Sequence, residues 1–308
     1  MSPVAASLVP VFLLIVTGWA VRVSGIVNES HWAGFEKVTY LVLFPALVVE
    51  TLARADLAHA PLAAVGGALM GAILLMAALL LATRPLMARW LAIDGPSFTS
   101  VFQGALRWNT FVAIALCGSL FGKEGTTLCA VAIAAMIPLL NVTCVLVLSR
   151  HAGGAPLGPA ALAGTLIRNP FIWSSLLGIA INATGAPVPA TVLSYAEILG
   201  RASLAAGLLV VGAGLDLARL RRPSLALALA TVVKLAGMPL LAATLARLFG
   251  VEGVPLAVVV LCTAAPTASG SYMLARQMGG NAPLMAEILT VQTLVALITI
   301  PFALAWLS

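Results

Sequence analysis

The sequence predicts an all-α membrane protein with ten transmembrane helices, arranged as two inverted five-helix repeats whose fourth and ninth helices are broken and cross. Composition is the first observation: hydrophobic residues make up 62% of the 308 residues, and charged residues only 8%. A soluble domain carries about 25% charged residues, so this chain cannot cover its core in water. A span needs about 20 residues, which leaves room for roughly ten helices and no separate soluble domain.

The apolar runs, each ended by charge or by Gly and Pro, are the second observation. They predict helices at 5–23, 36–54, 62–83, 97–121 and 125–149, and again at 163–183, 189–215, 225–248, 255–278 and 283–307. Residues 1–149 then form the first repeat, 150–162 a cytoplasmic linker, and 163–308 the second repeat. The first run has no positive region before it, since Arg22 follows it, so it predicts a first helix rather than a signal peptide.

An internal repeat is the third observation. At an offset of 160, Pro10 matches Pro170, Gly18 matches Gly178, and Asp56-Leu57-Ala58 matches Asp216-Leu217-Ala218. An ungapped register over some fifty residues is uncommon even in an apolar chain. Because five is an odd number of spans, the second copy must be upside down relative to the first, as in many secondary transporters.

The distribution of Lys and Arg predicts the orientation. With the N-terminus outside, nine cations fall in cytoplasmic loops (Arg22, Lys37, Arg84, Arg89, Arg150, Arg219, Arg221, Arg222 and Arg276) and three on the other side (Arg54, Lys123 and Arg247). This excess favours a cytoplasmic-membrane protein with both termini outside. The net charge of +6 is spread over loops without interleaved aromatic residues, so the lipid bilayer is the expected partner and nucleic acid is not.

The ninth helix is predicted to break at Pro266, which lacks a backbone donor and clashes with the preceding turn. Hydroxyls follow the proline at Thr267, Ser269, Ser271 and Tyr272. Irregular backbone at membrane depth is tolerated only where protein buries it or water reaches it. The break therefore indicates a binding site.

The fourth helix is predicted to break opposite the ninth. At an offset of 158, Pro266 and Thr267 align with Trp108 and Asn109, which lie between Arg107 and Thr110. A charge at the bilayer centre costs at least about 2.5–3.5 kcal/mol, so Arg107 should face a partner or a watery cavity. The functional interpretation is that Arg107 and the half-helix N-termini bind an anion; the alternative is that Arg107 reaches the interface or pairs with a glutamate.

Other polar residues in the predicted spans have more than one possible role. Asn141 and Gln292 lie in the fifth and tenth helices and either bind substrate or hydrogen-bond between helices. Glu197 and Arg201 are four residues apart and should neutralise each other. Glu50 and Glu197 are the candidates for a proton-coupling carboxylate. The expected substrate-binding set is Arg107, Asn109, Thr110, Asn141, Pro266, Thr267, Ser269, Ser271, Tyr272 and Gln292.

No cofactor or metal site is expected. The four cysteines (Cys117, Cys129, Cys144 and Cys262) lie in apolar segments without a CxxC pair and are interpreted as small core residues. The three histidines (His31, His59 and His151) lie in loops and form no cluster. Because no Ser/His/Asp set converges either, the sequence does not indicate an enzyme.

The residues resemble the bacterial branch of the auxin efflux carrier family. The likeness rests on Arg107-Trp108-Asn109-Thr110, on Pro138-Leu139-Leu140-Asn141-Val142, and on Ala264-Ala265-Pro266-Thr267-Ala268 leading to Tyr272. It implies a scaffold domain, a transport domain with the crossed helices, elevator-like alternating access and a homodimer. It also implies organic-anion substrates, such as auxin in plant members and malonate or malate in bacterial ones. One departure is that no proline lies between Gln103 and Phe121, whereas plant carriers break both helices with proline.

The sequence therefore predicts a secondary active transporter, or permease, that moves a small organic anion across the membrane by alternating access. Two alternatives share the architecture. A sodium/proton antiporter usually needs carboxylates at the crossing, but Asp56, Asp94 and Asp216 all lie at helix ends. A sodium-coupled bile-acid-type symporter would show sodium-dependent uptake.

Overall fold

The computed structural model describes residues 3–55, 62–153, 160, 164, 167, 169–217, 224–268 and 270–306. Every regular element in these ranges is helical. Within the described ranges, six helices are long and apolar enough to cross a membrane, namely Ser30–Ala53, Leu62–Trp90, Gly95–His151, Ala190–Ala213, Leu225–Leu248 and Ala282–Ala305. Shorter apolar helices occupy Val9–Val23, Pro170–Thr184 and Gly253–Ala264. The prediction of an all-α, multi-pass membrane protein is confirmed.

The first half of the chain forms helices close to the predicted apolar runs. They are α1 (Pro3–Val23), α2 (Glu29–Val38), η1 (Thr39–Leu43), α3 (Phe44–Ala53), α4 (Leu62–Trp90), α5 (Gly95–Leu106) and α6 (Thr110–His151). Helix α5 begins after Asp94, whose carboxylate accepts a hydrogen bond from the Ser97 amide at 2.8 Å, as a preferred N-cap does. Helix α6 is interrupted at Gly122, whose φ of 58° only glycine adopts readily, so two of the predicted runs meet there.

The second half contains α8 (Pro170–Thr184), α9 (Ala190–Ala213), α10 (Leu225–Val232), η3 (Val233–Gly237), α11 (Met238–Leu248), α12 (Gly253–Ala264), α13 (Gly270–Met278) and α14 (Ala282–Ala305). Most of the predicted 150–162 linker lies outside the described residues. The sharp turn after α8 uses Gly185 in the left-handed region, at a φ of 61°.

Two single-turn π-helices accommodate prolines inside long helices. Segment η1 ends immediately before Phe44-Pro45, and η3 ends immediately before Met238-Pro239. A proline lacks the N–H that would close the preceding turn, and a wider π turn relieves its clash with the carbonyl of that turn. The irregularity before Phe44-Pro45 is therefore a π turn.

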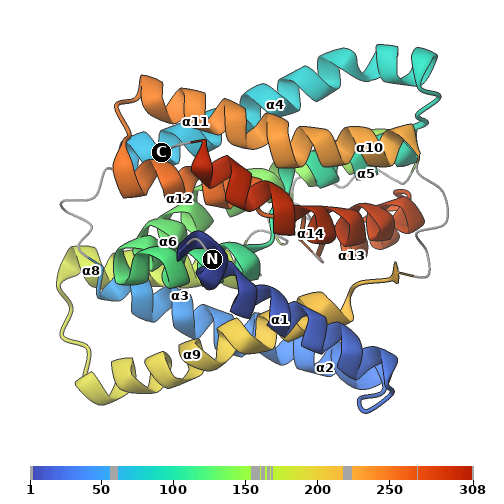
Figure 1. The fold of residues 1–308 in the computed structure, drawn as a ribbon. Helices are drawn as coiled ribbons and strands as arrows, with labels where there is room; N and C mark the ends of the chain where they lie inside the picture. Colours follow the sequence, from blue (N-terminus) through green and yellow to red (C-terminus); the bar gives the residue numbers. More distant parts are fainter. Residues whose placement is uncertain are drawn as a thin grey trace.

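The helices form two groups (Figure 1). The smaller group contains α1, α2, α3, α8 and α9, in which α1 packs on α9 and α3 packs on both α8 and α9. The α1–α9 crossing is close because Gly18 meets the backbone of Leu209 and Gly212 meets that of Ile15. The larger group contains α4, α5 and α10 to α14, and α6 contacts both groups.

Candidate functional site

The broken stretches between α5 and α6 and between α12 and α13 meet inside the protein. Arg107 and Asn109 have extended backbone, with ψ of 154° and 102°, and Ala265 after α12 has a ψ of 138°. The Asn109 amide donates a hydrogen bond to the Pro266 carbonyl at 2.6 Å. The two segments that the 158-residue offset aligned are thus in direct contact. Ser269 lies outside the described residues.

The break between α5 and α6 is stabilised by its own asparagine. The Asn109 side-chain oxygen accepts a hydrogen bond from the Val112 amide at 3.2 Å and so caps α6. Asparagine is among the best N-cap residues because it satisfies one of the free amides at a helix start. This cap explains how α5 and α6 separate without a proline.

The break between α12 and α13 is stabilised from α14. The Gln292 side-chain oxygen accepts from the Thr267 amide at 3.0 Å, and its nitrogen donates to the carbonyls of Gly104 at 3.0 Å and Ala230 at 3.1 Å. Gln292 is completely buried. The Thr267 amide and the Gly104 carbonyl lie at the two helix breaks, so Gln292 satisfies backbone groups that have no helical partner there.

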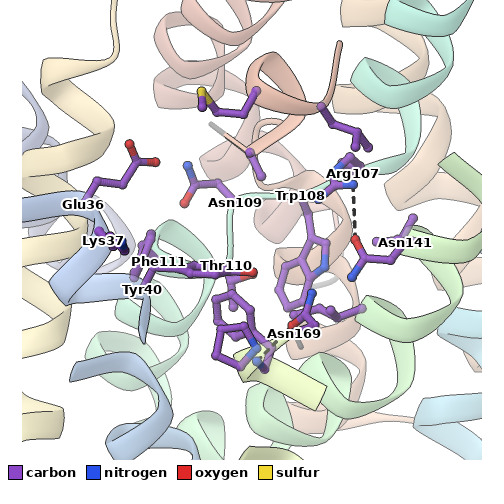
Figure 2. A pocket seen from close by; sticks show the side chains of 18 of the residues that line it. Glu36, Lys37, Tyr40, Arg107, Trp108, Asn109, Thr110, Phe111, Asn141 and Asn169 are labelled. Carbon is purple, nitrogen blue, oxygen red and sulfur yellow. Dashed lines mark hydrogen bonds between the residues drawn. The ribbon is translucent and has the colours of Figure 1, made fainter. Parts of the chain in front are cut away.

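A cavity of about 550 Å³ adjoins the crossing, between the two helix groups (Figure 2). This volume is typical of a small-molecule site. The smaller group contributes residues of α2, η1 and the start of α8, and the larger group contributes the α5–α6 break, α6 and α13. The polar lining residues are Glu36, Lys37, Tyr40, Arg107, Trp108, Asn109, Thr110, Asn141, Asn169 and Gln277.

Hydrogen-bond donors converge on one wall of this cavity. Arg107 Nη1 donates to Asn141 Oδ1 at 3.3 Å, so the guanidinium is held by a neutral amide rather than by a carboxylate (Figure 2). The Asn141 Nδ2 and Trp108 Nε1 atoms are buried and have no hydrogen-bond partner within the described part of the chain. Buried donors are almost always satisfied, so two unsatisfied donors beside a guanidinium indicate a place for an acceptor.

Three helix N-termini reach the same cavity. Thr110 begins α6, Pro170 begins α8, and Gly270 begins α13, and all three residues line it. The Asn169 side chain caps α8 by accepting from the Phe171 amide at 2.9 Å. A helix N-terminus carries a partial positive charge and favours an anion. The Arg107 guanidinium and the three helix N-termini therefore all favour an anion in this cavity.

The structure brings four of the predicted site residues to the cavity, namely Arg107, Asn109, Thr110 and Asn141. Pro266, Thr267, Ser271, Tyr272 and Gln292 are not among its lining residues. The Thr267 and Ser271 hydroxyls are buried and lie 3.2 Å apart, and Tyr272 packs against the apolar core. These residues are placed to hold the break.

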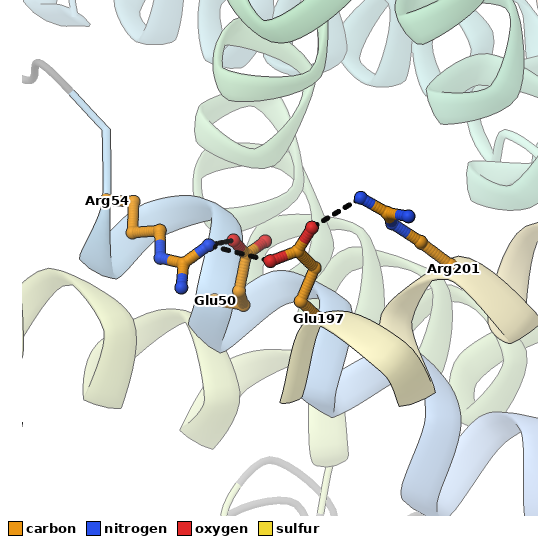
Figure 3. A network of polar contacts seen from close by, with 4 residues as sticks. All are labelled: Glu50, Arg54, Glu197 and Arg201. Atoms are coloured by element: carbon orange, nitrogen blue, oxygen red, sulfur yellow. Dashed lines mark hydrogen bonds and ion pairs between the residues drawn. The ribbon is translucent and has the colours of Figure 1, made fainter. Parts of the chain in front are cut away.

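Glu50 and Glu197 lie together, away from the cavity lining (Figure 3). Arg54 Nη1 contacts Glu50 at 2.8 Å and Glu197 at 2.9 Å, and Arg201 contacts Glu197 at 2.6 Å. The predicted Glu197–Arg201 neutralisation is confirmed. Both carboxylates are held by arginines at the α3–α9 contact.

Sequence reasoning missed several lining residues. Lys37 and Glu36 come from α2; the charge distribution of the sequence places Lys37 among the loop cations and does not single out Glu36. Asn169 was hidden within a predicted span, although an asparagine followed by proline is a recognisable helix start. Tyr40 lies on η1, and only the structure reveals the π turn that holds it.

Comparison with known proteins agrees with this geometry. Residues 161–304 match the family model described as membrane transport protein. The chain is 24% identical over 294 residues to a protein of Methanothermobacter thermautotrophicus described as an uncharacterized transporter, and the match covers 94% of each chain.

The resemblance to a transporter family inferred from the sequence is therefore confirmed over residues 161–304. Together with the apolar helices, these matches point to a multi-pass membrane transporter rather than an enzyme.

Proposed function

We propose that this transporter is a secondary active permease that carries a small organic anion through the cavity beside the crossing. The observation that carries the proposal is the set of donors around Arg107, which is held by Asn141 and accompanied by the unsatisfied Trp108 and Asn141 N–H groups. A guanidinium can grip a carboxylate with two hydrogen bonds. The carboxylate would receive the remaining donors as well.

The lining favours one carboxylate on an apolar body. Its charged residues are the two cations Lys37 and Arg107 and the carboxylate Glu36. Most of the remaining wall is apolar, formed by Phe111, Ile137, Leu140, Val145, Phe171, Met273 and Leu274. A second carboxylate would lose its hydration against this wall, and burying an unpaired charge costs much more than burying an apolar group. We therefore rank auxin-like monocarboxylic acids above malonate and malate.

The proposed architecture is two inverted five-helix repeats that cross at the two breaks. Three observations support it: the internal register of the sequence, the Asn109–Pro266 contact, and the approach of α5 and α12 to the crossing from opposite sides (Figure 1). On the orientation inferred from Lys and Arg, both termini lie outside the cytoplasmic membrane. The cavity, lined by Lys37 of α2 and Gln277 near the end of α13, then faces the cytoplasm.

Alternating access would follow from movement of the larger helix group against the smaller. The cavity lies between the groups, and Phe111 at the start of α6 packs directly on Gly207 of α9. Because Gly207 has no side chain, the Phe111 ring can move along α9 at this point without a steric clash. A homodimer formed through the smaller group would hold that group still in the membrane.

The proposal is tested by uptake of labelled mono- and dicarboxylates into proteoliposomes. Arg107→Ala and Arg107→Lys should both abolish uptake, because an ammonium cannot reproduce the two-pronged contact. Trp108→Phe keeps the ring and removes one donor, so KM should rise about 10-fold, the equivalent of about 1.4 kcal/mol. Arg201→Gln is the matched control, since Arg201 is 79% exposed and outside the cavity.

Uptake that persists in Arg107→Ala would refute the anion-binding role. Running the assay with an imposed proton gradient and then with an imposed sodium gradient separates the coupling modes. Stimulation by sodium alone would favour the bile-acid-type symporter, and sodium-driven pH changes without any organic substrate would favour the antiporter.

A further inference from the structure

Three of the four cysteines come together behind the crossing. Cys117 and Cys129 lie on the two segments of α6, on either side of Gly122, and Cys262 lies on α12. Their sulfur atoms are all within 4.8 Å of one another, and the side chains are completely buried. No local pattern indicates this cluster, because Cys262 is far from the other two cysteines in the chain.

The spacing of the sulfur atoms suits a metal ion. With metal–sulfur bonds of about 2.3 Å, tetrahedral or trigonal coordination separates the sulfur atoms by about 3.8–4.0 Å. The Cys129 and Cys262 sulfur atoms are 3.9 Å apart, and small rotations of Cys117 would complete the triangle. Thiolates select soft ions of the zinc class.

A buried lysine lies beside the cluster. Lys234 of η3 is completely buried, and its Nζ has no hydrogen-bond partner in the ranges that the structure covers. Segment η3 packs against α12, the helix that carries Cys262. An uncompensated ammonium in the membrane interior is costly, so such a residue needs a counter-charge.

Charge balance connects the lysine with the thiols. A divalent ion bound by three thiolates carries a net charge of −1, and the Lys234 ammonium returns the centre to zero. A monovalent ion would leave a net negative charge in the apolar interior. Of these two cases, only the divalent ion gives a centre of zero net charge with three thiolates and the Lys234 ammonium.

We propose that Cys117, Cys129 and Cys262 bind one soft divalent metal ion of the Zn²⁺ class, with Lys234 as its counter-charge. Binding replaces three S–H bonds by three metal–sulfur bonds and releases three protons to the solvent. Zinc is held by three protein ligands in many proteins, with a fourth position left open. The ion would tie the α6 segment that follows one break to the α12 segment that precedes the other, and so fix the crossing.

The first test is the metal content of the full-length protein, purified without an affinity tag and dialysed against a weak chelator. We expect one equivalent of zinc per chain, retained in Cys144→Ala and lost in Cys129→Ala and Cys262→Ala. Cys144 is the matched control because it is equally buried on α6 and lies outside the triangle. Less than a tenth of an equivalent in the wild-type protein, or full retention in Cys129→Ala, would overturn the proposal.

A second measurement does not depend on the variants folding. Cd²⁺ added to wild-type protein stripped of metal should produce thiolate charge-transfer absorption that saturates at one equivalent. Lys234→Met should weaken Cd²⁺ binding at least 10-fold. Absence of the absorption band, or an intact mass showing a disulfide in place of metal, would refute the site; unchanged binding in Lys234→Met would refute the charge balance.

Discussion

Replacing Gln292 by Leu should strongly destabilise the crossing while keeping the side-chain volume nearly constant. The change leaves two buried backbone groups without a partner, the Thr267 amide and the Gly104 carbonyl, and it removes one of two donors from the Ala230 carbonyl, which also accepts from the Val233 amide. A buried polar group that loses its partner costs about 1–3 kcal/mol, whereas hydrogen bonds inside membrane proteins average about 0.6 kcal/mol. Two groups at about 1–2.5 kcal/mol each predict a loss of about 2–5 kcal/mol.

The assay is thermal unfolding of the purified protein in detergent at a fixed scan rate, because membrane proteins often unfold irreversibly. With an unfolding entropy of about 2.1 cal/mol/K per residue, 1 kcal/mol shifts the Tm of a 308-residue chain by about 1.5 °C, so Gln292→Leu should lower it by about 3–8 °C. Thr293→Val is the matched control. Thr293 is also buried, but its hydroxyl donates a hydrogen bond to the Leu289 carbonyl of its own helix at 2.7 Å, so its loss does not affect the crossing. A Tm for Gln292→Leu within 2 °C of that control would refute the reasoning.

Three further predictions concern other parts of the fold. Gly207→Val places a side chain where the Phe111 ring packs, so proteoliposome uptake should fall at least 10-fold. The fall should be seen in protein that elutes as a single folded species on size-exclusion chromatography. Glu197→Gln removes the ion pairs to its two arginines but not the cavity, so uptake should stay within twofold of wild type; loss of uptake would assign Glu197 a coupling role. Hydrogen bonds from Ser97 hold the pKa of the Asp94 carboxyl below its usual range, so this carboxylate stabilises the fold at neutral pH and the contribution disappears as pH falls through that lowered pKa. Asp94→Asn keeps a cap that does not titrate and should therefore flatten the acid side of a Tm-against-pH curve.

Much of the fold could be predicted because membrane depth restricts the chain so strongly. Apolar runs of the right length had to be helices, and Pro266 had to interrupt one of them. The internal register then located a second break, and the Asn109–Pro266 contact shows that the aligned segments meet. Local rules were sufficient here because each break is caused by residues at the break itself.

The lining of the cavity was less predictable because it depends on contacts between distant segments. Lys37 and Asn169 join Arg107 only through the packing of the two helix groups, which no local pattern encodes. Gln292 was expected either to bind substrate or to link helices, and only its three backbone partners decide between those roles. The cysteine triangle could not be predicted either, because it also depends on contacts between distant segments of the chain.

The two breaks are built differently, and the difference assigns them different tasks. Asn109 caps its own helix and leaves its neighbour Arg107 facing the cavity, so the first break carries the charge that the proposed function assigns to anion binding. Pro266 and Thr267 turn inward instead, toward Asn109 and Gln292, so the second break supplies a fixed backbone support. A guanidinium on an unsupported loop would lose binding energy to disorder, whereas one held against a buried, hydrogen-bonded partner is already in place when the anion arrives. Weakening the support at Gln292 should therefore reduce anion affinity as well as stability, although Gln292 does not line the cavity.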